Sequence, residues 1–495
     1  MISLMTIDTV RYDALVVGTG FSGIAASVML QSRGMNFVIL EKAPASGGTW
    51  YHNHYPGLTV DIPAPLYSLS FALNPNWTQW YAHQSQILQY ERDVIKSYKL
   101  DEHIRYNQHV VRGEWNEKSN EWTVYTSDGN QYVTRYLIWG AGPLHAPLFP
   151  DIKGMDDFGG QVFHSAEWRD DVDLTGKRVA VVGTGASALQ IVPAIADKVA
   201  DLQLYQRTAA WVLPLPNWEI PEGWQQRFKD HPWTMRAFRI ALYWVHEYLT
   251  YGVARRPKAL KPLEWWARLH VRKNIADPEL RRALTPSYPI GFKRLGKHPR
   301  FIKTLNRPNV SVVTDPIQSV TPKGIVTADG TERPVDVIIY ATGFHVTDSY
   351  KAFDLVGLNG ANLVDMWDQN GLEALLGVTV DNMPNLFLLL GPYTGVGSTS
   401  ILVMSEAQVR YIDKLMDLVE KSGAKAVVPR REAINAFVAW AQQKMKRTVW
   451  VTPGDYNKSY YQDEHGRVTT LWPDFTWTYV LKTRRPNRKS FDFIK

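Results

Sequence analysis

Glycines occur twice in this sequence at a spacing that can bring the backbone close to a phosphate group. In the first case Gly18, Gly20 and Gly23 follow the apolar run of residues 14–17 in a G-x-G-x-x-G pattern. The first glycine allows a tight turn, the second lets a pyrophosphate approach, and the third lets the next helix pack closely on the strand. Free N–H groups at the start of that helix would face the phosphates. The pattern predicts a dinucleotide-binding turn.

A carboxylate stands where the second strand of this unit should end. Residues 24–31 are predicted to form the helix and residues 37–40 the strand, and Glu41 follows directly. A carboxylate at this place can accept hydrogen bonds from ribose hydroxyls. An N-terminal unit with glutamate at the ribose is typical of an FAD site, so we predict FAD here.

The glycine pattern returns in the middle of the chain. Gly183, Gly185 and Ala188 follow the apolar run of residues 179–182 in a G-x-G-x-x-A pattern, with a helix predicted from about Ser187. This second unit predicts a second dinucleotide site, and both units should be α/β with parallel sheets.

The second unit ends differently from the first. Its second strand, predicted at residues 202–205, leads into Gln206 and Arg207 rather than into an acid. An acid would bind a free ribose 2′-hydroxyl and repel a 2′-phosphate, whereas an arginine favours the phosphate. We therefore predict NADPH at the second site.

Composition narrows the class of protein. A chain of 495 residues should form two or three domains. The net charge of +7 is spread along the chain without a recognition motif, so we expect a solvated surface and no nucleic-acid partner. The absence of cysteine excludes thiolate metal sites and the redox-active cysteine pair of disulfide reductases. Oxygen-using monooxygenases and quinone-type reductases remain, and no metal is predicted.

A motif between the two sites makes a resemblance specific. The stretch FGGQVFHSAEW places Phe158, Gly160, His164 and Trp168 in the pattern F-x-G-x-x-x-H-x-x-x-W. This resembles the fingerprint of the Baeyer–Villiger monooxygenases, although the family usually continues with Pro or Asp where this chain has Arg169. We interpret His164 and Trp168 as structural residues of the linker between the nucleotide domains.

Other segments resemble the same family over nearly the whole chain. The segments QRTAAWVLP, GFKRL, NRPNV, YATGF and TTLWP follow in family order. Tyr67 lies six residues beyond Asp61, where family members contact the flavin. Tyr393 and the segment GKHPR after Arg294 depart from the family, which leaves the substrate range most open. The block GGTWYHNHYPGLTVD matches the family through Gly47, Gly48, Trp50, Tyr55, Pro56, Gly57 and Asp61.

The resemblance implies a reaction. NADPH reduces FAD, reduced flavin and O₂ form a C4a-peroxyflavin, and this attacks a hydrophobic ketone to give an ester or lactone, with possible sulfoxidation as a side activity. Arg294 is the implied cation beside the flavin, and Asp61 is its carboxylate partner. Lys293, with Arg207 and Thr208, is implied to hold the 2′-phosphate.

The resemblance implies further cofactor contacts. For FAD they are Ser22, Lys42, Gly48, Thr49, Trp50, Val110 and Ile401, and for NADPH they are Thr184 and Ser187.

Two Rossmann-like dinucleotide-binding domains are expected. The FAD domain should span residues 1–145 and be completed by 346–495, and the NADP domain should span 146–345 with a helical insertion at about 217–284. The segments joining them should act as hinges, so that the NADP domain rotates.

The apolar stretch of residues 233–252 contains Arg236, Arg239 and Glu247. We interpret it as a helix of the insertion rather than as a membrane contact. No membrane-spanning helix or secretory signal is expected, and a cytoplasmic location is predicted.

Other functions remain open from sequence. A flavin-containing monooxygenase that oxidises N or S atoms is the nearest alternative, followed by an NADPH–quinone reductase and a non-catalytic nucleotide sensor. The oligomeric state is not predicted.

Overall fold

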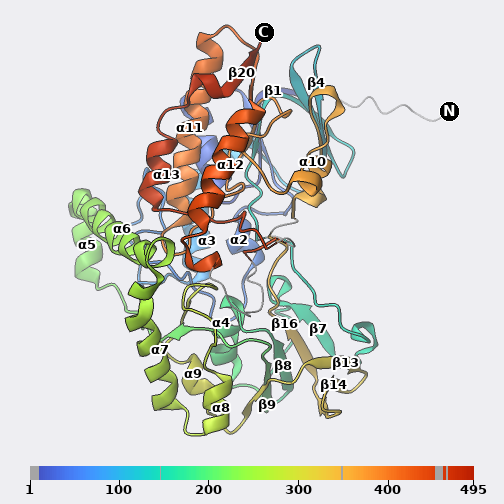
Figure 1. Ribbon diagram of the computed structural model, residues 1–495, viewed down its shortest axis with the longest axis vertical. Coiled ribbons are helices and arrows are strands. Elements are labelled where there is room, and N and C mark those ends of the chain that lie inside the picture. The colour runs from blue at the N-terminus through green and yellow to red at the C-terminus, as the bar shows by residue number, and fades with distance from the viewer. Residues whose placement is uncertain (1–9, 145, 347–348, 452–460, 464–465) are drawn as a thin grey trace, which may run out of the picture.

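The two glycine turns belong to two separate sheets. The structure, a computed structural model, describes residues 10–144, 146–346, 349–451, 461–463 and 466–495. The first sheet lies in the upper half of Figure 1 and has the strand order β17-β4-β5-β6-β1-β2-β3, with β18 beside β6. Its strands are β1 (Val10–Val17), β2 (Phe37–Leu40), β3 (Ile104–Arg105), β4 (Val110–Asn116), β5 (Glu121–Thr126), β6 (Gln131–Trp139), β17 (Asp354–Val356) and β18 (Leu386–Leu388).

The second sheet lies in the lower half of Figure 1 and has five parallel strands in the order β12-β9-β8-β16-β7. They are β7 (Gln161–His164), β8 (Arg178–Val182), β9 (Asp201–Tyr205), β12 (Val310–Val313) and β16 (Val337–Tyr340). This doubly wound arrangement confirms the predicted α/β class.

Smaller pieces of sheet complete the strand inventory. β10 (Val212–Leu213) pairs with β11 (Gly296–Lys297), and β19 (Ala426–Pro429) pairs with β20 (Phe491–Ile494). β13 (Ile317–Thr321) pairs antiparallel with β14 (Gly324–Thr327), which also pairs with β15 (Glu332–Pro334). Val320 alone is buried along β13, so this strand is only partly covered.

The helices cover both sheets and fill the predicted insertion. α1 begins at Phe21, three residues earlier than predicted, because the helix follows the turn at Gly20 directly. Four helices, α5 to α8, lie within the predicted insertion. No helix in the described ranges is long and apolar enough to cross a membrane. The helices are α1 (Phe21–Ser32), α2 (Gly48–His52), α3 (Gln84–Ser97), α4 (Ala186–Ile195), α5 (Glu222–Asp230), α6 (Pro232–Ala254), α7 (Lys261–Asn274), α8 (Pro278–Ala283), α9 (Phe301–Thr304), α10 (Leu363–Asn370), α11 (Ile401–Lys421), α12 (Arg431–Met445) and α13 (Thr476–Lys482).

Two antiparallel segments connect the sheets. The backbone N–H of Leu148 donates to the carbonyl of Gly343 at 2.9 Å, and the N–H of His345 donates to the carbonyl of Ala146 at 3.0 Å. The segment that leaves the first sheet and the segment that returns to it therefore lie side by side. The predicted boundary residue 145 lies outside the described residues.

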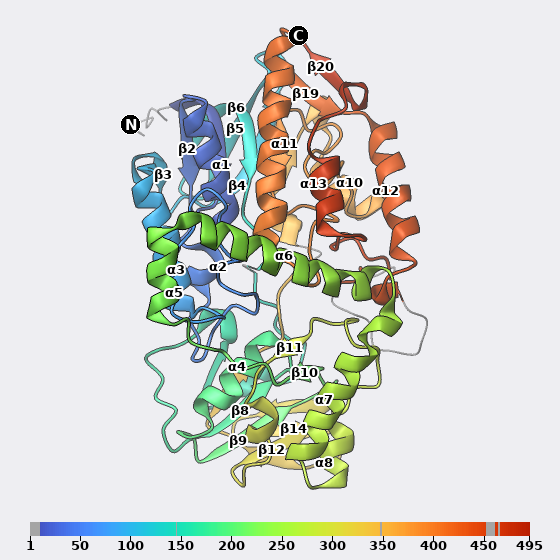
Figure 2. The ribbon, with the colours of Figure 1, turned by 90° about the vertical axis from the view of Figure 1, so that its left-hand side faces the viewer.

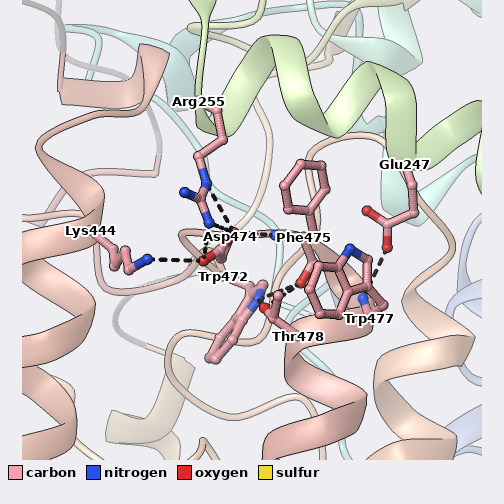
Figure 3. A network of polar contacts seen from close by, with 8 residues as sticks. All are labelled: Glu247, Arg255, Lys444, Trp472, Asp474, Phe475, Trp477 and Thr478. Atoms are coloured by element: carbon pink, nitrogen blue, oxygen red, sulfur yellow. Dashed lines mark hydrogen bonds and ion pairs between the residues drawn. The ribbon is translucent and has the colours of Figure 1, made fainter.

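The insertion reaches back to the first sheet's side of the molecule. In Figure 2, α6 runs across the molecule beneath α11 and α13. Arg255, at the end of α6, donates to both carboxylate oxygens of Asp474 at 2.7 and 2.8 Å, and Lys444 approaches the same carboxylate at 3.4 Å (Figure 3). The C-terminal segment is therefore bound to the insertion by charge.

The contact between α1 and β1 gives a test of the fold. A Cβ added at Gly23 would lie 1.9 Å from the carbonyl oxygen of Gly18, whereas at Gly185 it would meet no atom within 4 Å. We expect Gly23→Ala to lower the free energy of unfolding by about 1–3 kcal/mol, because the helix must move away from the turn. Gly185→Ala should unfold like the wild type. Equal thermal unfolding midpoints for the two variants would contradict this packing.

Candidate active site

Glu41 is already oriented at the end of β2. One of its carboxylate oxygens accepts hydrogen bonds from the N–H and the hydroxyl of Thr19 at 2.9 and 2.6 Å, and the other accepts from the N–H of Ala43 at 2.9 Å. The oxygen that accepts only from Ala43 retains a lone pair for a ribose hydroxyl. The side chain is therefore held beside the first glycine turn, as an FAD ribose site requires.

The first turn faces a second glycine segment. A Cβ on Gly48 would lie 2.8 Å from the Cα of Gly20, so only glycines allow this approach. Trp50, on the same short helix, donates from its indole N–H to the hydroxyl of Tyr67 at 3.2 Å. Thr49 lies between Gly48 and Trp50. The structure thus brings the predicted FAD residues of α1 and α2 together.

Residues distant in sequence reach the same turn. The hydroxyl of Ser405, on α11, donates to that of Ser22 at 2.9 Å, which places Ile401 at the start of α11 on the same side. Gln108, two residues before the buried Val110, donates its N–H to the carbonyl of Glu41 at 2.8 Å.

Lys42 follows Glu41, and its side chain is exposed although part of it is removed from solvent. Burial lowers its pKa, and the Glu41 carboxylate opposes that shift. An anionic ligand would favour the charged amine in the same way that Glu41 does.

The second turn is open where a phosphate would approach. Nothing lies within 4 Å of a Cβ built on Gly185, at the start of α4. The hydroxyl of Thr184 donates to the carbonyl of Thr208 at 2.7 Å and joins this turn to the end of β9. Ala188 is fully buried beneath the helix, and Ser187 stands beside it near the hydroxyl of Tyr55. The open backbone fits a dinucleotide.

Two cations converge beyond β9. Burial lowers the pKa of Lys293, and the nearby charge of Arg207 lowers it further. The Lys293 ammonium lies 5.2 Å from the ring centroid of Tyr288, whose hydroxyl donates to the carbonyl of Ala209 at 2.9 Å. Two neighbouring cations repel each other, and an anion bound between them offsets this repulsion. The pair therefore suits a 2′-phosphate.

Asp61 and Arg294 form a two-pronged ion pair. The Arg294 Nε donates to one carboxylate oxygen and the terminal nitrogen to the other, each at 2.6 Å. Burial opposes ionisation of Asp61, but the charge and hydrogen bonds of Arg294 outweigh it and lower the pKa to about 2. Asp61 comes from the first nucleotide unit and Arg294 from the second, so the pair bridges them.

Sequence reasoning missed Lys297, a third member of this cluster. Its ammonium donates to the backbone carbonyl of Asp61 at 2.7 Å and lies 5.8 Å from the ring centroid of Tyr81. Burial lowers the pKa of Lys297, whereas the Asp61 carboxylate raises it. Its segment, GKHPR, was the place where the sequence departed from the family, and that departure was the available signal.

A buried acid near the first turn was also missed. Glu91 is 1% exposed, and burial raises its pKa well above the usual range, with Glu41 acting in the same direction. Its place among the buried residues Ile87, Val94 and Ile95 of α3 was visible as periodicity.

The fingerprint residues are packed rather than placed for chemistry. His164 is fully buried, which lowers its pKa to about 4. Trp168 is buried against Phe163, with ring centroids 5.2 Å apart. Both agree with the structural interpretation. Tyr393 is likewise buried and accepts from Gln442 at 2.8 Å, so it packs in the core.

Comparisons with known proteins agree with this geometry. Residues 15–229 match the family model described as pyridine nucleotide-disulphide oxidoreductase, although this chain has no cysteine for disulphide chemistry. A Baeyer–Villiger monooxygenase from Pseudomonas aeruginosa is 40% identical over 474 residues, covering 95% of this chain and 89% of the relative.

Solved structures are similar over the whole length. OTEMO in complex with FAD and NADP has a TM-score of 0.87 at 27% identity, over 98% of this chain and 99% of that one. Cyclohexanone monooxygenase bound to ε-caprolactone has a TM-score of 0.86 at 27% identity, over 98% and 100%. With both nucleotide sites formed and a relative this similar along nearly its full length, the chain belongs to the Baeyer–Villiger monooxygenases, enzymes that use FAD and NADPH.

Proposed function

We propose that this enzyme oxidises an apolar ketone to an ester or lactone. The balanced reaction consumes the ketone, O₂, NADPH and a proton and yields the ester, NADP⁺ and water. Sulfoxidation is proposed as a side activity, and the predicted cytoplasmic location stays a prediction.

We assign the two cofactors to the two units. FAD would be held by the turn from Gly18 to Gly23 and by Glu41, and NADPH by the turn from Gly183 to Gly185 with Arg207 and Lys293. When bound, the flavin supplies hydride acceptance and oxygen activation. The protein's own part is binding, orientation and charge.

The observation that carries this proposal is the Asp61–Arg294 pair. Oxygen insertion beside a carbonyl develops negative charge on oxygen, which a fixed cation stabilises strongly in a site shielded from water. Arg294 stays protonated in any pocket, and Asp61 fixes the plane of the guanidinium through two hydrogen bonds of 2.6 Å. Asp61 neutralises one of the two cations, Arg294 and Lys297, so the cluster keeps a net positive charge.

An apolar ketone suits the surroundings of this pair. The aromatic side chains of Trp50 and Tyr81 are buried near it, and that of Tyr67 is partly buried. The charge of Asp61 acts on the pKa of both tyrosines. The lactone bound to the related cyclohexanone monooxygenase supports a ketone as the substrate.

Removing the Arg294 guanidinium should separate the two half-reactions. We expect Arg294→Ala to retain flavin reduction by NADPH but to lower ester formation at least about 100-fold, because the charge on oxygen loses its partner. Rapid mixing measures the rate of flavin reduction. Mass analysis of the products from a panel of ketones measures ester formation.

A surface pair provides the control. Arg169 also forms two hydrogen bonds to one carboxylate, that of Asp171. Arg169→Ala should change neither half-reaction. Unchanged ketone oxidation in Arg294→Ala, or equal loss of flavin reduction, would contradict the role of Arg294.

Cofactor choice should depend on Arg207. We expect Arg207→Ala to raise the KM for NADPH about tenfold or more and to leave that for NADH nearly unchanged, since only NADPH carries the 2′-phosphate. Arg178, paired with Asp336 at the opposite end of the same sheet, is the matched control. Equal effects on the two KM values would refute the assignment.

Lys297 should act both by holding the Asp61 backbone and by adding positive charge to the site. We expect Lys297→Met to lower kcat for ketone oxidation about tenfold. The acidic limb of its pH profile should move to higher pH, because the loss of positive charge favours protonation of the oxygen nucleophile. Lys297→Arg should restore most of the rate. A pH profile that is unchanged in Lys297→Met, with only thermal stability lost, would show a purely structural lysine.

A further inference from the structure

One face of α6 is apolar and exposed to solvent. Trp233, Ile240, Trp244 and Tyr248 are 65%, 57%, 57% and 73% exposed. They follow one another at intervals of seven, four and four residues, so they share one face of the helix. Single exposed apolar side chains are ordinary, but a contiguous row of large ones marks an interaction surface.

Two of the three charged residues that argued against membrane contact, Arg239 and Glu247, face the protein rather than the solvent. Arg239 lies 3.8 Å from the Glu406 carboxylate and donates to the carbonyl of Ser68 at 3.2 Å. Glu247 accepts from the backbone N–H of Trp477 at 3.0 Å (Figure 3). Both are used to dock the inner face of α6 on the molecule. Arg236 alone among the three is exposed.

The apolar face continues onto α13. Trp477 and Leu481 are exposed, four residues apart on that helix, and Glu247 holds the start of α13 against α6. In Figure 1 the helices α5 and α6 project at the left edge, and in Figure 2 this side faces the viewer with α6 across its front. Among the described residues, the face is therefore the outermost layer of this side.

Positive charge surrounds this face. Residues 222–274 contain eleven Lys and Arg, of which Arg239 and Arg255 are ion-paired with other parts of the protein, against four Asp and Glu. Residues 476–489 contain five Lys and Arg and no acid. Exposed Lys229 precedes α6, and exposed Arg256 and Lys258 follow it. Aromatic side chains framed by lysine and arginine are the composition of helices that lie in the interface of a bilayer.

We propose that α6, with the start of α13, binds the surface of an anionic lipid bilayer. The aromatic side chains enter the headgroup region, and the surrounding cations interact with the lipid phosphates. A second copy of the chain fits less well, because a two-fold contact would set this basic surface against itself. Such docking would place the enzyme where apolar ketones dissolve.

Vesicle sedimentation tests the proposal with the FAD-loaded protein. We expect it to bind vesicles of phosphatidylcholine and phosphatidylglycerol in equal parts, to bind phosphatidylcholine alone much less, and to lose binding as salt is added. The triple variant Ile240→Ser, Trp244→Ser, Tyr248→Ser should bind roughly 100-fold more weakly. Its turnover of a small water-soluble ketone should equal that of the wild type, which also shows that it is folded.

Charge variants separate the lipid surface from other partners. Arg236→Glu should weaken binding at least about fivefold. Lys323→Glu should not, since the exposed Lys323 follows β13 on the opposite side of the molecule (Figure 1). The proposal fails if wild type and triple variant bind vesicles equally. It also fails if the wild type does not bind vesicles but forms dimers that the triple variant cannot form.

Discussion

The ion pair between Asp61 and Arg294 sets the charge at the point where the two nucleotide units meet. It is formed through two hydrogen bonds of 2.6 Å and joins a loop of the first nucleotide unit to a loop of the second. A guanidinium held in this way is charged, oriented and available before the reaction begins. The sheets, turns and insertion can be understood as the means of keeping the two loops together.

Other contacts reinforce the same meeting point. The hydroxyl of Tyr55 donates to Gln190 on α4 at 3.2 Å, and Gln190 donates to the carbonyl of Thr59 at 2.9 Å. A Cβ on Gly57 would lie 2.9 Å from the Gln190 carbonyl. The segment leading to Asp61 is thus packed on the helix that begins at the NADPH turn. These contacts tie the position of Asp61 to that of α4.

Much of this architecture was predictable because it is local. The strand at residues 37–40, the turn glycines and Glu41 follow from short-range pattern, and the structure places them as expected. Arg294 and Asp61 required the resemblance, since they are 233 residues apart. Lys297 and the outward face of α6 could not be predicted. Both depend on which side of an element faces the protein. In the sequence, the charges of residues 233–252 argued against membrane contact, because the sequence does not show that Arg239 and Glu247 face inward.

Oxygen from O₂ should enter the ketone. Turnover with NADPH and isotopically labelled O₂, with an apolar cyclic ketone and an unlabelled solvent, tests this most directly. We expect a lactone whose mass is raised by one labelled oxygen atom. When only the water is labelled, the lactone should carry no more label than the unreacted ketone has acquired by exchange with the water. Consumption of NADPH with hydrogen peroxide as the sole product, across ketones that fit the site, would contradict it.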